Sequence, residues 1–110
     1  MRESHTTVLE RSRTWQGQFE TEPYEAAWAG EAIFFVRALE VSGAVEGCEA
    51  VVQISPDGMH WCDEGTRVPL PTDPDVTFGR VRHFGTYLRL VGELPEGAET
   101  KVIVYLVLKE

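Results

Sequence analysis

Residues 60–64, "HWCDE", include four side chains of the types that bind metal ions. His60 and Cys62 are two positions apart, so on a strand they would project from the same face. A metal site in a protein needs three or four ligands, and the sequence has no second cluster such as C-x-x-C or H-x-x-x-H. We therefore expect a surface histidine and a free thiol here, with no metal ion and no cofactor.

Three arginines, Arg80, Arg82 and Arg89, concentrate positive charge in the segment "FGRVRHFGTYLRL". Arg80 and Arg82 would share one face of a regular strand. Guanidinium groups bind carboxylates in a bidentate manner, so these residues could contact an acidic or sugar ligand, or an acidic patch on a neighbouring subunit. The simpler expectation is that they pair with the chain's own surplus of carboxylates.

Catalytic signatures are missing from the sequence. It contains no G-x-S-x-G, no H-E-x-x-H and no glycine-rich phosphate loop, and its three histidines stand in unrelated settings. Close carboxylates such as Asp73 and Asp75 lie in a proline-rich turn, where no apolar pocket would raise the pKa of one of them. The sequence therefore predicts a protein that is not an enzyme.

Length and charge restrict the other classes of function. The chain has 110 residues, enough for one domain, and a formal charge of −8, which repels nucleic acid. No apolar run approaches the roughly 20 residues of a membrane helix. The first 15 residues lack the apolar stretch of a secretory signal. We expect a cytoplasmic or virion-associated protein that binds neither nucleic acid nor a membrane.

Short runs of β-branched and aromatic residues, separated by glycine and proline, predict the elements that must position these side chains. The predicted strands cover residues 14–20, 31–41, 48–54, 59–62, 76–83, 85–91 and 101–108. This pattern indicates an all-β antiparallel sandwich of about seven to eight strands, with a jelly roll as one form of it. Residues 15–110 would make the single domain, and the polar residues 1–14 a flexible N-terminal arm.

The stretch "VVQISPDGMHW" predicts a hairpin with Ser-Pro-Asp-Gly at its turn. With the turn centred between Pro56 and Asp57, Ile54 faces Met59 and Val52 faces Trp61. These four side chains would form one apolar patch, with Trp61 filling the core. Cys48 and Cys62 would point to opposite sides of this hairpin, so we expect no disulfide between them.

Two segments, 32–41 and 101–108, are apolar at both odd and even positions. Sandwich strands normally alternate apolar with polar residues because one face meets water. The side chains that would need cover include Phe35, Ile103, Tyr105 and Val107. The arm, the loop at 68–75 or another subunit could supply that cover. We expect a homo-oligomer, with a trimer as one candidate, in which these four residues form the interface.

The hairpin "VVQISPDGMHW", the later "FGTYLRLVG" and the final "VIVYLVL" together resemble small β-sandwich proteins of tailed bacteriophages. The residues that carry the resemblance are Ser55, Asp57, Gly58 and Trp61 in the hairpin, and Tyr87, Leu88, Arg89 and Leu90 in the later strand. The resemblance implies a non-catalytic subunit that builds or decorates a capsid, a tail or another protein shell, in contact with itself and with the larger assembly.

The same hairpin and arginine strand are also similar to discoidin-type (coagulation factor 5/8 C-like) sandwiches. That resemblance implies ligand binding by loops at one end of the sandwich, with carbohydrate as one ligand. Exposed aromatic rings would then stack on sugar rings, and Trp15, Tyr24 and Trp28 are the candidates. A carbohydrate-binding module is therefore the alternative to the structural subunit.

Overall fold

The computed structural model describes residues 4–82 and 84–110; the start of the predicted arm (1–3) and His83, the end of a predicted strand, lie outside them. The described residues form nine strands and no helix, and thus hold no helix able to cross a membrane. The strands are β1 (Ser4–Gln16), β2 (Gln18–Glu20), β3 (Tyr24–Glu25), β4 (Glu31–Ser42), β5 (Glu49–Ser55), β6 (Cys62–Pro69), β7 (Val76–Arg82), β8 (Tyr87–Glu93) and β9 (Glu99–Lys109).

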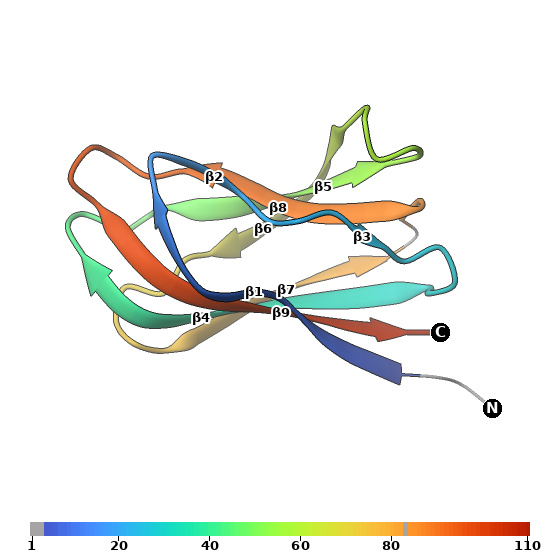
Figure 1. The fold of residues 1–110 in the computed structure, drawn as a ribbon, viewed down its shortest axis with the longest axis horizontal. Coiled ribbons are helices and arrows are strands. Elements are labelled where there is room, and N and C mark those ends of the chain that lie inside the picture. The colour runs from blue at the N-terminus through green and yellow to red at the C-terminus, as the bar shows by residue number, and fades with distance from the viewer. Residues whose placement is uncertain (1–3, 83) are drawn as a thin grey trace.

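Two antiparallel sheets pack face to face (Figure 1). Sheet A has the strand order β1-β9-β4-β7, and sheet B has the order β2-β8-β5-β6, with β3 also paired to β8. When the two-residue β3 is set aside, this order is that of a jelly roll. The predicted all-β sandwich is therefore confirmed, with more strands than expected because β1, β2 and β3 divide the N-terminal quarter of the chain.

The core lies between the sheets and is built by alternation along each strand. On β9, every second residue from Val102 to Leu108 is fully buried, and Phe34 and Val36 of β4 are buried beside them. Sheet B contributes Val52, Leu88 and Leu90 from the opposite side; the largest fully buried side chains are Phe34, Leu88, Leu90, Leu106, Leu108, Val36, Val45, Val52, Val68, Val81, Val102 and Val104. Alternation directs the neighbouring residues of the same strands outward.

Strands β6 and β7 close one side of the sandwich, although they belong to different sheets. A Cβ atom at Gly79 would lie 2.7 Å from the Cγ2 of Val68, so glycine is what allows β6 to approach β7 this closely. The hydroxyl of Thr66 donates a hydrogen bond of 3.1 Å to the backbone carbonyl of Arg80. The outer edge of β7 is thus covered by β6.

The N-terminal segment differs from its prediction. Residues 4–14, assigned to a flexible arm, belong to β1, which pairs antiparallel with β9 along its length. The predicted strand at 14–20 is divided at Gly17 (φ 60°), where the chain leaves sheet A and enters sheet B. An edge strand has one free side and needs little apolar sequence, so a polar composition did not reveal β1.

The predicted hairpin register is wrong. Ile54 is paired with Cys62 rather than with Met59, because β6 begins at Cys62. Met59 is 74% exposed in the turn, and Trp61 is half-buried outside the core cluster. The turn is longer than a four-residue turn because side-chain hydrogen bonds, described below, hold the chain beyond Gly58.

Candidate functional site

The outer face of sheet A carries a group of neighbouring apolar side chains, which we call the apolar face. Its members are the outward side chains of all four strands: Val8, Ile33, Phe35, Val76, Phe78, Ile103, Tyr105 and Val107. The structure thus places the four residues predicted from the doubled apolar pattern on one surface. Sequence analysis missed Val8, Val76 and Phe78, because β1 and β7 are not apolar at both parities.

A single row of neighbours crosses the whole sheet at the centre of this face. Val8 is paired with Tyr105, Tyr105 with Phe35, and Phe35 with Phe78. The rings of Phe35 and Phe78 are 6.0 Å apart between centroids and tilted by 42°. Cross-strand aromatic and β-branched pairs stabilise a sheet, but Phe78 is still 48% exposed.

The apolar face is not part of the core. Val76 and Phe78 are 47% and 48% exposed, and the predicted interface residues Phe35, Ile103, Tyr105 and Val107 are half-buried. Among the described residues, the partly buried apolar side chains that pack against the core are others, such as Leu9, Ile54 and Phe84. These side chains are therefore partly buried by their neighbours in the same sheet. The N-terminal segment, proposed as a cover, lies beside them as strand β1 and not over them.

Positive charge lies at both ends of the apolar face. Arg80, Arg82 and Lys109 surround Ile33 and Val107 at one end, around a hollow of about 290 Å³ that Glu31 also lines. The guanidinium of Arg80 lies 5.0 Å from the ring centroid of Phe78, and that of Arg82 lies 3.5 Å from the carboxylate of Glu31. At the other end, Arg37 is paired with Ile103, and Lys101 lies two positions before Ile103 on β9.

This charge runs against that of the whole molecule. The strands of sheet A contain seven basic and four acidic residues, a balance of +3, whereas the chain as a whole has a charge of −8. The strands of sheet B contain two basic and six acidic residues, a balance of −4. The apolar face therefore belongs to a sheet whose strands are net basic, in a protein that is acidic as a whole.

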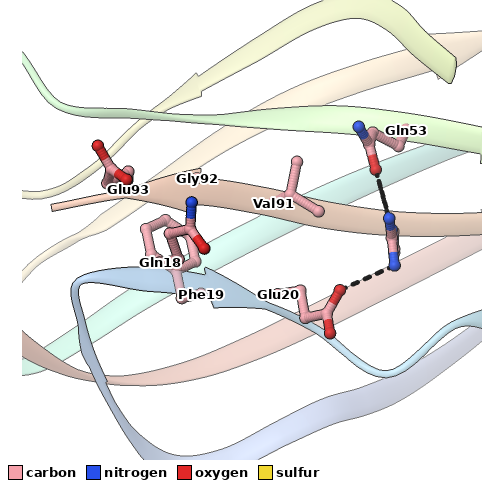
Figure 2. A pocket seen from close by; sticks show the side chains of 8 residues that line it. Gln18, Phe19, Glu20, Gln53, Val91, Gly92 and Glu93 are labelled. Atoms are coloured by element: carbon pink, nitrogen blue, oxygen red, sulfur yellow. Dashed lines mark hydrogen bonds and ion pairs between the residues drawn. The ribbon is translucent and has the colours of Figure 1, made fainter. Parts of the chain in front are cut away.

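Arg89 is the centre of a polar network on the outer face of sheet B. Its Nε and Nη2 donate hydrogen bonds of 2.9 and 2.8 Å to the Oε1 of Gln53, and its Nη1 donates one of 2.8 Å to the Oε2 of Glu20. Figure 2 shows Gln53 and Glu20 reaching toward this side chain from either side. The guanidinium also lies 4.1 Å from the ring centroid of Trp61. All three guanidinium nitrogens of Arg89 thus have hydrogen-bond partners within the chain.

An open depression surrounds this arginine network. It is lined by Gln18, Phe19, Glu20, Gln53, Arg89, Val91, Gly92 and Glu93. Figure 2 places Gln18 and Glu93 at the end remote from Gln53. The three arginines predicted as ligand or partner contacts are therefore not one cluster. Arg89 lies on sheet B, whereas Arg80 and Arg82 lie on sheet A.

The turn at 55–61 is held by its own side chains. The Oγ of Ser55 accepts hydrogen bonds from the backbone N–H groups of Asp57 and Gly58, at 3.2 and 2.8 Å. The Oδ1 of Asp57 accepts from the N–H groups of Met59 and His60, at 2.8 and 2.9 Å. The hydrogen bonds from the backbone of His60 and of Met59, with one from the His60 ring, hold the pKa of Asp57 well below its usual range.

Two tryptophans were predicted as ligand or partner contacts, and they lie in opposite environments. Trp15 is only 2% exposed and stacks on Phe19 with 4.1 Å between ring centroids, so its ring cannot meet a ligand. This prediction is wrong because β1 turns Trp15 into the gap between the sheets. Trp28 is 44% exposed in the loop after β3, and Tyr24 packs against the core.

The "HWCDE" segment does not converge on a point. His60 is in the turn with its Nδ1 2.7 Å from the Oδ2 of Asp57, and Asp63 accepts a hydrogen bond from Gln53. Across residues 4–82 and 84–110, no three metal-ligating side chains come together, and Cys48 and Cys62 are free thiols.

Comparison with known proteins does not assign this chain to a family. The sequence matches no protein-family model, and it matches no curated protein.

Proposed function

We propose that this protein is a non-catalytic structural subunit that self-associates through the apolar face and so builds or decorates a larger protein shell. The observation that carries the proposal is the row Val8–Tyr105–Phe35–Phe78, which crosses sheet A with no charged residue in it. Large contiguous apolar patches are rare on soluble monomers, and those that occur are commonly used for binding.

The shape of the surface suits a second sheet. A flat sheet face packs against another sheet at a spacing of about 10 Å, and the side chains of the two faces interdigitate. Burying apolar surface contributes about 25 cal/mol for each Å² removed from water. Phe78, which is 48% exposed, would gain most from such a contact, and the half-buried Phe35 beside it would gain less.

The charges at the ends of the face favour an orderly contact. Cations at both ends, such as Arg37 and Arg82, leave the central row uncharged. The two edge strands of sheet A are also basic, with Arg11 and Arg13 on β1 and Arg80 and Arg82 on β7. Like charges therefore disfavour a contact that places these ends or edges of two copies together, and the uncharged centre remains the favoured contact.

We propose a bacteriophage-type shell because "VVQISPDGMHW" and "FGTYLRLVG" resemble small sandwich proteins of tailed bacteriophages. Jelly rolls occur in viral capsids and also in lectins, so the fold is compatible with this role without selecting it. In this setting the protein would work in the cytoplasm or within a virion.

A carbohydrate-binding role has weaker support. Of the three aromatic residues that could stack on a sugar, Trp15 is buried and Tyr24 packs against the core, which leaves Trp28. Sugar sites normally combine an aromatic platform with polar groups that fix the orientation of the ligand. Binding on a glycan array that is lost in Trp28→Ala would favour this alternative over the structural role.

The decisive experiment measures mass by light scattering coupled to size exclusion. The wild-type protein should give a multiple of 12.4 kDa, a trimer included, and the double variant Phe35→Thr/Phe78→Thr should shift to a smaller species. Threonine favours strands, so this variant removes the rings without breaking the sheet. Met59→Thr is the matched control, because Met59 is more exposed than Phe78 but lies away from the apolar face. A wild-type monomer at high concentration would refute the proposal.

A further inference from the structure

The edges of the two sheets are protected unequally. An unpaired strand edge presents free N–H and C=O groups to any other strand, and proteins usually cover it, shorten it, bend it or charge it. On one side of the sandwich, β6 and β7 cover each other through Thr66, Val68 and Gly79. On the other side, the edge of sheet B is made of the short strands β2 and β3, which Pro23 separates.

Strand β1 is the remaining edge, and its two halves differ. Beyond Val8, two register shifts and a left-handed Ser12 (φ 54°) interrupt the regular strand, and Arg11 and Arg13 add charge. Such bulges and charges are the usual protection of an edge. The second half of β1 is thus guarded against pairing.

The first half of β1 has none of these features. Residues 4–8, "SHTTV", run in unbroken register with Lys109 to Tyr105 of β9 and contain no lysine, arginine, acidic residue or proline. Among the described residues, β1 has a strand neighbour on one side only. Figure 1 shows this half of β1 reaching outward beside the end of β9, along the margin of the sheet.

We propose that residues 4–8 of β1 pair antiparallel with the same residues of a second copy, around a two-fold axis at Thr6 or Thr7. This inference rests on the proposed self-assembly and adds a second contact to it. A two-fold axis perpendicular to the sheet keeps each face on its own side, so Thr6 would lie beside Thr6 of the partner copy, or Thr7 beside Thr7. Threonine pairs across strands are favourable, and no like charges meet.

The second copy is the occupant that the neighbouring surface favours. Thr6 and Val8 point to the same side as Val107 and Tyr105, so edge pairing would join the apolar faces of two copies into one surface. A single two-fold contact closes as a dimer, whereas an extended shell needs at least two different contacts on each subunit. The apolar face and the edge of β1 would be those two contacts.

Cysteine cross-linking tests the pairing directly. In a Cys48→Ser/Cys62→Ser background, the single variants Thr6→Cys and Thr7→Cys are oxidised with copper phenanthroline and resolved on a non-reducing gel. Opposed residues of an antiparallel pair have Cα atoms about 4.5–5.5 Å apart, a separation that a disulfide bridges. We expect a strong covalent dimer from at least one of the two variants. Gln16→Cys, on the guarded end of the same strand, is the control and should stay monomeric.

Equal cross-linking in all three variants, or none in either threonine variant, would overturn the edge pairing. Repeating the oxidation in the Phe35→Thr/Phe78→Thr background separates the two proposals. Persistent cross-linking with a mass that stops at a dimer supports both contacts. If the protein assembles but neither threonine variant cross-links, only the edge pairing is refuted. If a threonine variant cross-links but Phe35→Thr/Phe78→Thr leaves the mass of the assembly unchanged, only the contact through the apolar face is refuted.

Discussion

The two sheets of this sandwich share one core but present opposite outer faces. On sheet A, Phe35 and Tyr105 lie side by side at the centre of an apolar surface. On sheet B, the corresponding central position is taken by Arg89, whose fork is held by Gln53 and Glu20 and whose plane is covered by Trp61. A polar face satisfied by its own partners needs nothing from outside, whereas an apolar face gains free energy only when something covers it.

The arginines of the two sheets also differ in exposure and in their partners. Arg89 is 19% exposed in its side chain and spends its donors within the chain. Arg82 is 72% exposed and lies 3.5 Å from Glu31, a geometry that contributes little to stability in water. Arg89 on sheet B therefore helps to hold the fold, whereas Arg82 on sheet A remains free to meet a neighbour.

The largest expected effect comes from adjacent phenylalanines that face opposite ways on β4. Phe34→Ala should lower the free energy of unfolding by about 3–5 kcal/mol, because it opens a cavity in the core. Phe35→Ala should cost about 1 kcal/mol or less in the dilute monomer but should weaken self-association. Urea unfolding in dilute solution and light scattering at high concentration measure the two effects. Equal losses of stability would contradict the assignment of the two faces.

An intermediate effect is expected on sheet B. Arg89→Met should lower the free energy of unfolding by about 1–2 kcal/mol, since Gln53 and Glu20 lose their donors and Trp61 loses its cation. The size of the assembly should not change. Arg67→Met is the control on the same face, where the ion pair to Glu49 at 3.6 Å is exposed and should be nearly neutral. A change of assembly size in Arg89→Met would mean that this face also binds a partner.

The smallest effect is a pH dependence from the turn at 55–61. Hydrogen bonds from His60 and Met59 depress the folded-state pKa of Asp57 below its unfolded value of 3.8, so the ionised carboxylate favours folding. That contribution is complete above the unfolded pKa and is lost as the pH falls through and below it. Urea unfolding between pH 6 and about pH 3 should show a smaller decline in Asp57→Asn than in wild type.

Asp73→Asn, in the loop before β7, controls for the loss of one carboxylate and should decline as wild type does. An unchanged pH profile in Asp57→Asn would show that the turn does not depend on the charge. The assembly should be insensitive to this substitution, because the turn belongs to the sheet B side of the molecule.

Several features could be predicted because they are local in the sequence. Spacing of apolar runs and turns predicted an all-β sandwich, and the doubled apolar pattern at 101–108 predicted that Ile103, Tyr105 and Val107 lie on the second face of a strand whose first face is core. Period-two alternation is a property of the backbone, so it survives whatever the strand packs against.

Other features depend on where the chain goes next. The hydrogen bonds of Ser55 and Asp57 lengthen the turn, so the partner of Ile54 is Cys62, three residues beyond the predicted Met59, and Met59 lies in solvent. Trp15 gives no sequence sign of being buried, because its burial follows from the change of sheet at Gly17.

The amino-acid sequence by itself determined that this chain forms short antiparallel strands and that two of them are apolar on both sides. Only the tertiary structure decided that these two strands are neighbours and that β1 and β7 extend their outer side into one surface with cationic ends. The physical reason is that alternation is encoded residue by residue, whereas adjacency in a jelly roll joins strands distant in the sequence.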